Sequence, residues 1–232
     1  MIQVKRVLEI HEGYRNVTKF FNFKNASSYD FIVYLTTFGQ DSFWKNEIIK
    51  ILNEPSSVLD LACGTGILSS MLMDNTMKNV IGLDIVFDYL EIAKKKRKEM
   101  FLTNGTAEIL PYKNECFDSV VSSYLGKYVD VKKVVEECWR VLNHNGIIVF
   151  HDFTYPKNDL VQSFWNIYFV VLRMAGRIVK PWETVFKELD QVVRSSRWVE
   201  QTIYSLEQKG YKNIYCKYYT FGTSAIISAR KP

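Results

Sequence analysis

The sequence predicts an α/β fold, in which helices cover both faces of a doubly wound, mostly parallel sheet. Three observations support this prediction. Short apolar segments alternate with amphipathic ones along most of the 232 residues, which is the pattern of repeated βαβ units. The first apolar strand runs directly into a turn of small residues, within 58–66. Two more strand-like segments close the chain, and their link is too short for a parallel crossover.

The first half of the chain is expected to contain a leading helix and two strand–helix units. The leading helix carries Trp44, Ile48, Ile51 and Leu52 at the spacing of one buried face. The strands are almost continuously apolar, as in a sheet that is buried on both faces. The expected elements are helix 41–52, strand 57–61, helix 66–74, strand 79–84 and helix 86–98.

The second half continues the alternation and then departs from it. A turn over 143–146 (Asn-His-Asn-Gly) is expected to precede a strand. Only 220–222 (Thr-Phe-Gly) link the last two strands, which predicts an antiparallel hairpin at the edge of the sheet. The expected elements are strand 101–103, strand 116–122, helix 130–142, strand 147–150, a helical stretch over about 157–208, and strands 211–219 and 223–229.

Composition argues against several classes of protein. The N-terminus lacks the long apolar run of a signal peptide, and no apolar stretch approaches membrane-spanning length. The four cysteines are scattered without metal-ligand spacing, so we expect reduced thiols in a cytoplasmic protein and no metal site. The formal net charge is +5, and the excess lies wholly within 151–232. That excess is too small to indicate a nucleic-acid partner.

The turn after the first strand predicts the ligand. Gly64 and Gly66 let the backbone approach a nucleotide-like molecule closely. Asp60 stands just before the turn, where its charge would oppose a pyrophosphate. Asp84 ends the next strand, where a carboxylate can accept both hydroxyls of a ribose. S-adenosylmethionine combines a ribose and an adenine with two positive charges and no phosphate, so we expect it to be the cofactor.

Polar side chains also follow the other strands. In an open parallel sheet the ligand lies at the carboxyl ends of the strands. The residues at or just past such ends are Asp60, Asp84, Thr106, Ser123 and Asp152.

We divide the single domain, residues 1–232, by its expected elements. The parts are an N-terminal helical cap (1–54), a cofactor-binding core (55–155), a helical lid or substrate region (156–210) and a C-terminal hairpin (211–232).

The chain resembles the class I S-adenosylmethionine-dependent methyltransferases. The resemblance rests on Asp60-x-Ala62-x-Gly64-x-Gly66, on 105–112 after the third strand, on 117–123, and on 140–146. It implies a Rossmann-like sheet of seven strands. At the adenine contact Thr106 replaces the family's Asp or Asn, and a hydroxyl is a weaker partner there. The expected cofactor-binding residues are Tyr29, Asp60, Ala62, Gly64, Thr65, Gly66, Asp84, Ile85, Thr106, Ala107, Glu108 and Ser123.

The flanking segments are most similar to the ubiquinone/menaquinone biosynthesis C-methyltransferases. Tyr29-Asp30, 37–40 with Trp44-Lys45, and 152–156 (Asp-Phe-Thr-Tyr-Pro) match that family's segments in order. The chain departs from the pattern at Ile32-Val33, where the family has Met-Asn, and at Lys127-Tyr128, where it has Arg-Asn. The resemblance implies C-methylation of a prenylated quinol precursor, such as demethylmenaquinol. Two alternatives stay open: a methyltransferase for another lipid or small molecule, and a non-catalytic subunit that binds S-adenosylmethionine.

Attack by a ring carbon requires that a quinol hydroxyl lose its proton, so a base is expected. Asp152 is the first candidate and the neighbouring His151 the second. For His151, a histidine that is merely hydrogen-bonded at a strand end is the favoured interpretation. Lys127 and Tyr128 could stabilise the developing phenolate; a surface lysine and a packed tyrosine explain these two residues equally well. Tyr29 and Tyr124 are expected either to line the pocket or to belong to an ordinary aromatic core.

The stretch 160–180 is apolar around most of a helix. A lid packed over the sheet explains this. We also consider that it admits a polyprenyl tail and rests on a bilayer, because the positive charge is concentrated in the same third of the chain. The expected partners are thus a lipophilic small molecule and a membrane surface, contacted peripherally, with a homodimer left open.

Overall fold

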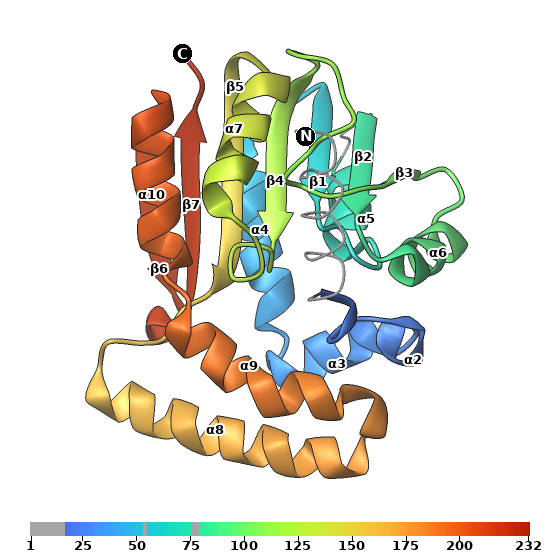
Figure 1. The fold of residues 1–232 in the computed structure, drawn as a ribbon, viewed down its shortest axis with the longest axis vertical. Coiled ribbons are helices and arrows are strands. Elements are labelled where there is room, and N and C mark those ends of the chain that lie inside the picture. The colour runs from blue at the N-terminus through green and yellow to red at the C-terminus, as the bar shows by residue number, and fades with distance from the viewer. Residues whose placement is uncertain (1–16, 53–54, 76–78) are drawn as a thin grey trace, which may run out of the picture.

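A computed structural model describes residues 17–52, 55–75 and 79–232. One seven-stranded sheet runs through the molecule in the order β3-β2-β1-β4-β5-β7-β6 (Figure 1). Strands β1 to β5 are parallel, and β7 pairs antiparallel with both β5 and β6. The fold prediction, including the antiparallel C-terminal pair, is confirmed. The strands are β1 (Ser57–Leu61), β2 (Asn79–Asp84), β3 (Phe101–Asn104), β4 (Phe117–Ser123), β5 (Leu142–Phe153), β6 (Lys212–Tyr219) and β7 (Ser224–Arg230).

Helices cover both faces of the sheet because both faces are apolar. Leu59, Val120 and Ile148 join one core with α7 and α10, and Val58, Val121 and Val149 join another with α4. These helices and their neighbours are α4 (Gln40–Leu52), α5 (Ile67–Asp74), α6 (Phe87–Lys96), α7 (Val131–Val141) and α10 (Trp198–Lys209). The predicted helices thus lie where expected, within two residues at each end.

Further helices lie across the carboxyl end of the parallel strands (Figure 1). They have an aromatic-rich core of their own, which includes Ile32, Phe169, Trp182 and Phe186. The elements are α2 (Phe23–Ala26), α3 (Tyr29–Thr36), α8 (Asp159–Ile178), η1 (Lys180–Trp182) and α9 (Glu183–Ser195), with η2 (Thr220–Gly222) at the hairpin. The sequence predicted only a helical stretch for α8 and α9, and a helical cap over 1–54 without bounds for α2 and α3.

The turn predicted over 143–146 is wrong, since this segment belongs to β5. Leu142 pairs with Phe117, the register then shifts, and pairing resumes between Ile147 and Ser119. The polar residues form an irregularity within the strand, where Asn145 takes a φ of 61°. The predicted cap, 1–54, includes 1–16 and 53–54, which lie outside the described residues. Within the described residues, no helix combines the length and the apolar character needed to cross a membrane.

Candidate active site

The turn after β1 is shaped by close packing. Gly66 has a φ of +77°, and a Cβ there would lie 3.1 Å from the side chain of Met100 and 3.2 Å from Ala93. Glycine is therefore required both by the backbone conformation and by the contacts with α6 and with the residue just before β3. Gly64 also has a positive φ, of +56°. The turn places its backbone beside the end of β2.

Asp84 connects this turn to the beginning of α6. One carboxylate oxygen accepts the backbone N–H of Gly64 and the other accepts that of Val86, both at 2.8 Å. Burial raises the pKa of Asp84 to about 6, although both hydrogen bonds favour the ionised form. The carboxylate is thus held rigidly at the carboxyl end of β2, as the sequence predicted.

A cavity opens at the carboxyl ends of β1, β2 and β4, and most of its wall is apolar or aromatic. Asp84 and Glu108 are the only charged residues among the described residues that line it. The lining residues are Val17, Phe21, Tyr29, Ala62, Gly64, Leu83, Asp84, Ile85, Val86, Tyr89, Gly105, Thr106, Ala107, Glu108, Ser123, Tyr124, Leu125, Tyr128 and Val129. Most of the predicted cofactor residues are therefore brought together here.

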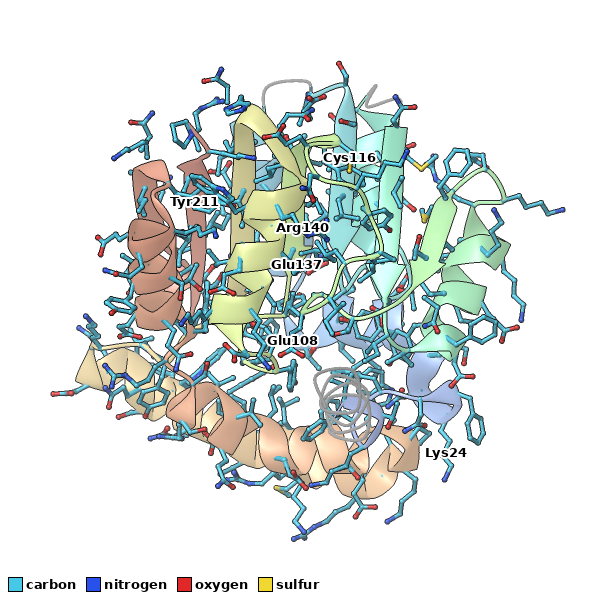
Figure 2. The ribbon with its side chains drawn as sticks, turned by 45° about the horizontal axis from the view of Figure 1, so that its top comes forward. Lys24, Glu108, Cys116, Glu137, Arg140 and Tyr211 are labelled. Carbon is cyan, nitrogen blue, oxygen red and sulfur yellow. The ribbon has the colours of Figure 1, made fainter. Side chains whose placement is uncertain are left out.

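The segment after β3 is tied to α7, which holds its polar side chains at the cavity. The Glu108 carboxylate accepts the backbone N–H of Asp130 at 2.8 Å, and that of Glu137 accepts the N–H of Leu110 at 2.7 Å. Arg140 donates to the carbonyl of Leu110 at 2.9 Å. In Figure 2, Arg140 and Glu137 of α7 and Glu108 of the segment after β3 lie one below another.

Three predicted cofactor residues, Asp60, Thr65 and Gly66, are not among the residues lining the cavity in the described part of the chain. Asp60 accepts a hydrogen bond of 2.6 Å from Ser69 of α5, and burial raises its pKa to about 7. Thr65 donates to Asp30 of α3 at 2.5 Å. These residues therefore stabilise the turn through contacts with α5 and α3 rather than line the cavity.

Aromatic side chains from separate segments complete the cavity. Tyr29 and Tyr124 line it, which is one of the two roles expected for them. Phe21 and Tyr89 were missed; the Phe21 ring lies 5.9 Å from those of Tyr89 and Tyr128, edge-on to both. No sequence spacing indicates Phe21, because the contact depends on how the N-terminal segment folds back. Tyr89 lies five residues after Asp84, so the start of α6 could have suggested it.

Lys127 and Asp152 form a buried ion pair behind this aromatic wall. Their charged groups are 2.5 Å apart, and their side chains are 3% and 0% exposed. The Lys127 ammonium lies 4.6 Å from the ring centroid of Tyr128 and 5.3 Å from that of Tyr124. Burial lowers the pKa of Lys127, and the charge of Asp152 opposes that shift. Of the four predicted catalytic residues, Tyr128 lines the cavity and this pair lies next to it.

His151 links two strands. One ring nitrogen shares a hydrogen bond of 2.8 Å with Ser123, and the other shares one of 2.9 Å with Ser224 of β7. Burial, together with the charges of Lys45 and Lys127, holds its pKa well below the usual value. The imidazole is therefore neutral and has both nitrogens occupied.

The residues present suit S-adenosylmethionine. A rigid carboxylate at the end of β2 can accept ribose hydroxyls, and an apolar wall suits an adenine ring. The charged residues that line the cavity in the described part of the chain, Asp84 and Glu108, are both acidic, which favours a positively charged ligand and opposes a pyrophosphate.

Comparison with known sequences agrees with this chemistry. The model of the ubiE/COQ5 methyltransferase family matches residues 9–231. A demethylmenaquinone methyltransferase of Lactobacillus johnsonii is 30% identical over 216 residues, which cover 87% of each chain. The ubiquinone/menaquinone biosynthesis C-methyltransferase UbiE of Campylobacter jejuni is 26% identical, covering 89% of this chain and 94% of its own.

Solved structures share the fold at low identity. A SAM-dependent methyltransferase of Archaeoglobus fulgidus is 13% identical with a TM-score of 0.64, covering 88% of this chain and all of its own. A phosphoethanolamine N-methyltransferase of Haemonchus contortus, solved with S-adenosylhomocysteine, is 14% identical with a TM-score of 0.61. It covers 82% of this chain, which spans 52% of that protein.

Proposed function

The chain belongs to the ubiE/COQ5 methyltransferase family, and we propose that its methyl acceptor is a prenylated quinol of the demethylmenaquinol type. The enzyme is a methyltransferase whose methyl donor is S-adenosylmethionine. The proposal for the acceptor is supported by two relatives, named for demethylmenaquinone and for ubiquinone/menaquinone biosynthesis, that match most of this chain.

The cofactor supplies an activated methyl group, so the protein chiefly binds, aligns and excludes water. Asp84 would hold the ribose, and the 105–108 segment would hold the adenine. The observation that carries this assignment is the cavity wall, where the described charged residues, Asp84 and Glu108, are both acidic. The Asp60 and Thr65 side chains would act indirectly, by fixing the turn that carries Gly64.

The Lys127–Asp152 ion pair would stabilise a phenolate on the acceptor. Negative charge develops on an acceptor oxygen when its hydroxyl loses a proton, and a fixed positive group nearby stabilises that charge. We assign this role to Lys127, whose ammonium lies behind the Tyr128 ring. The Tyr128 hydroxyl makes no hydrogen bond with any described residue, and the residue lines the cavity. It can therefore donate directly to the acceptor.

Asp152 stays our candidate for the proton acceptor. It accepts hydrogen bonds from the Lys127 ammonium, from the Lys127 N–H at 3.3 Å and from the Phe153 N–H at 2.7 Å. It can take a proton only after one of these is released. We assign no proton transfer to His151, because both of its nitrogens are hydrogen-bonded and its pKa is low.

Labelled S-adenosylmethionine and a reduced short-chain demethylmenaquinol test the proposal. We expect wild type to transfer the methyl group to a ring carbon, identified by mass spectrometry. Asp84→Asn should weaken cofactor binding at least about tenfold, because one hydroxyl acceptor becomes a donor and the charge is lost. Asp88→Asn, in the first turn of α6, is the matched control. Absence of cofactor binding by wild type would contradict the assignment of the cavity.

A second candidate is methylation of another lipid or small molecule. This candidate is favoured by Lys127-Tyr128, because the pattern of the quinone-biosynthesis C-methyltransferases has Arg-Asn at these positions. An ammonium does not replace a planar guanidinium. Cofactor binding without transfer to the quinol, but with transfer to another component of a lipid extract, would support this candidate.

We further propose that the outer face of α8 contacts a membrane surface. Its side chains leave a stripe of exposed apolar groups, 47% to 84% exposed: Leu160, Phe164, Ile167, Val170, Val171, Met174 and Ile178. Only Phe169, Leu172 and Gly176 of this helix are buried. The helix lies at the edge of the molecule, beneath α9 in the view of Figure 1. Co-sedimentation with anionic vesicles tests this, and recovery that does not depend on lipid would contradict it. A homodimer stays a prediction.

A further inference from the structure

A second buried ion pair lies next to the active site, and the mechanism above does not use it. Asp41 and Lys45 stand one turn apart on α4, in direct contact, with side chains that are 6% and 3% exposed. A buried ion pair is a weak source of stability, because desolvation of both charges offsets their attraction. Its presence beside the cavity therefore calls for an explanation other than stability.

Tyr124 connects this pair to the cavity. Its hydroxyl donates to Asp41 at 2.7 Å, and the residue lines the cavity at the end of β4. Burial and the charge of Asp41 raise the pKa of Tyr124 well above its usual value, so the phenol keeps its proton. Its backbone has a φ of 72°, in the left-handed region that a bulky residue seldom adopts. The strained conformation is held by the Tyr124 N–H, which donates to the His151 carbonyl at 2.8 Å.

The ring of Tyr124 is also held from several sides. The ammonium of Lys45 lies 4.9 Å from its centroid and that of Lys127 lies 5.3 Å away. Phe153 stacks on it at 4.9 Å with an interplanar angle of 23°. Both buried ion pairs thus converge on one phenol at the cavity wall. Such fixation is what a group needs in order to orient a bound molecule.

We propose that Tyr124 contacts the aromatic ring system of the methyl acceptor and selects a hydroxylated ring, and that Asp41 is the residue that positions it. The proposal rests on the proposed function, and it names the group that recognises the acceptor. The single proton of the phenol is committed to Asp41, so its oxygen has only lone pairs to offer. It can accept a hydrogen bond from an O–H of the acceptor and cannot donate one to a carbonyl or an ether.

A pair of simple probes tests this without turnover. The protein is saturated with S-adenosylhomocysteine and titrated calorimetrically with 1-naphthol or with 1-methoxynaphthalene, which has the same ring and no O–H. Wild type should bind 1-naphthol at least about fivefold more tightly. Tyr124→Phe keeps the ring, so it should lose that preference while affinity for S-adenosylhomocysteine stays within about twofold.

Two further variants separate positioning from folding. Asp41→Asn combined with Lys45→Gln removes both charges together, so no unpaired charge is left buried; it should reduce the preference for 1-naphthol at least about twofold. Tyr219→Phe removes another phenol that donates to a carboxylate, that of Glu47, away from the cavity; it should retain the full preference. An unchanged preference in Tyr124→Phe, or no preference in wild type, would overturn the proposal. Failure to methylate a quinol would instead contradict the proposed function, because these titrations do not depend on turnover.

Discussion

Two buried aspartates flank the turn after β1, and their surroundings differ. Asp84 accepts two backbone N–H groups, whereas Asp60 accepts one serine hydroxyl. Burial raises both pKa values, to about 6 for Asp84 and about 7 for Asp60. Hydrogen bonds to the ionised form oppose both shifts, and the charge of Asp84 adds to the shift of Asp60.

These raised pKa values predict how stability depends on pH. The folded protein binds the Asp60 proton more tightly than the unfolded chain does. The contribution of this carboxyl group to the free energy of unfolding is therefore fully present below pH 4. It is lost as the pH rises through about 7, the pKa of Asp60 in the folded state. Asp60→Asn removes this dependence. Between pH 4 and pH 8, the free energy of unfolding of wild type should fall relative to that of Asp60→Asn, by on the order of 4 kcal/mol at most.

Urea unfolding at pH 5, 6, 7 and 8, without cofactor, measures this difference. Asp74→Asn is the control, because the Asp74 side chain is 60% exposed. Its profile should run parallel to that of wild type. If the Asp60→Asn profile were parallel as well, the raised pKa would be wrong.

At the scale of elements, the turn after β1 and a side chain of β3 approach β2 so closely that one position of β2 excludes a side chain. A Cβ on Gly82 of β2 would lie 2.7 Å from the Cys63 sulfur and 2.9 Å from Leu102. The glycine therefore lets the turn after β1 pack against the middle of β2. The local pattern of the strand, which is otherwise apolar, does not indicate this requirement.

Gly82→Ala should lower the free energy of unfolding by about 1–3 kcal/mol, the usual result of overpacking a core. Cys63→Ala removes the sulfur, so the same substitution should cost less in that background. Chemical denaturation of the four proteins of this cycle measures the coupling. Gly105→Ala is the control, because the nearest atom to its Cβ would be 3.5 Å away. Equal costs in both backgrounds would contradict the contact.

At the scale of the whole molecule, the apolar stripe on α8 is continued by a second element. Phe31, Tyr34, Leu35 and Phe38, on and just after α3, are 54% to 80% exposed. The Tyr168 hydroxyl of α8 donates to the Thr36 carbonyl at 2.8 Å, so the two elements are in contact. Helix α3 also contains Tyr29, which lines the cavity. A membrane-facing surface would therefore lie directly beside the active site.

Phe164→Ser, Ile167→Ser and Met174→Ser together should weaken vesicle binding at least about tenfold. Each removed side chain would otherwise contribute part of the 1.5–3 kcal/mol that full burial of such a group is worth, roughly. The control carries Phe87→Ser, Phe101→Ser and Tyr204→Ser, which are 60% to 67% exposed on other surfaces. Vesicle binding and thermal stability are measured for both proteins. Equal binding by the two would contradict a membrane role for α8.

Prediction from the sequence succeeded where local pattern and chemistry coincide. The strand before Asp60, the turn with Gly64 and the strand that ends in Asp84 lie where their periodicity placed them. It failed where distant contacts decide the outcome. The polar segment 143–146 has the composition of a turn, yet pairing with β4 draws it into β5. The predicted N-terminal helical cap had no bounds for α2 and α3, because their apolar side chains are divided between buried cores and an exposed surface.

The sequence by itself determined the sheet with its antiparallel end, the cofactor class and the family, because all three depend on periodicity and on residue types at short spacing. Only the tertiary structure decided what surrounds each polar group. It directed Asp60 toward Ser69, engaged both nitrogens of His151, and brought Asp41 of α4 to Tyr124, just after β4. The physical reason is that burial and hydrogen-bond partners come from segments far apart in the chain, and these set the pKa, the charge and the orientation of each group.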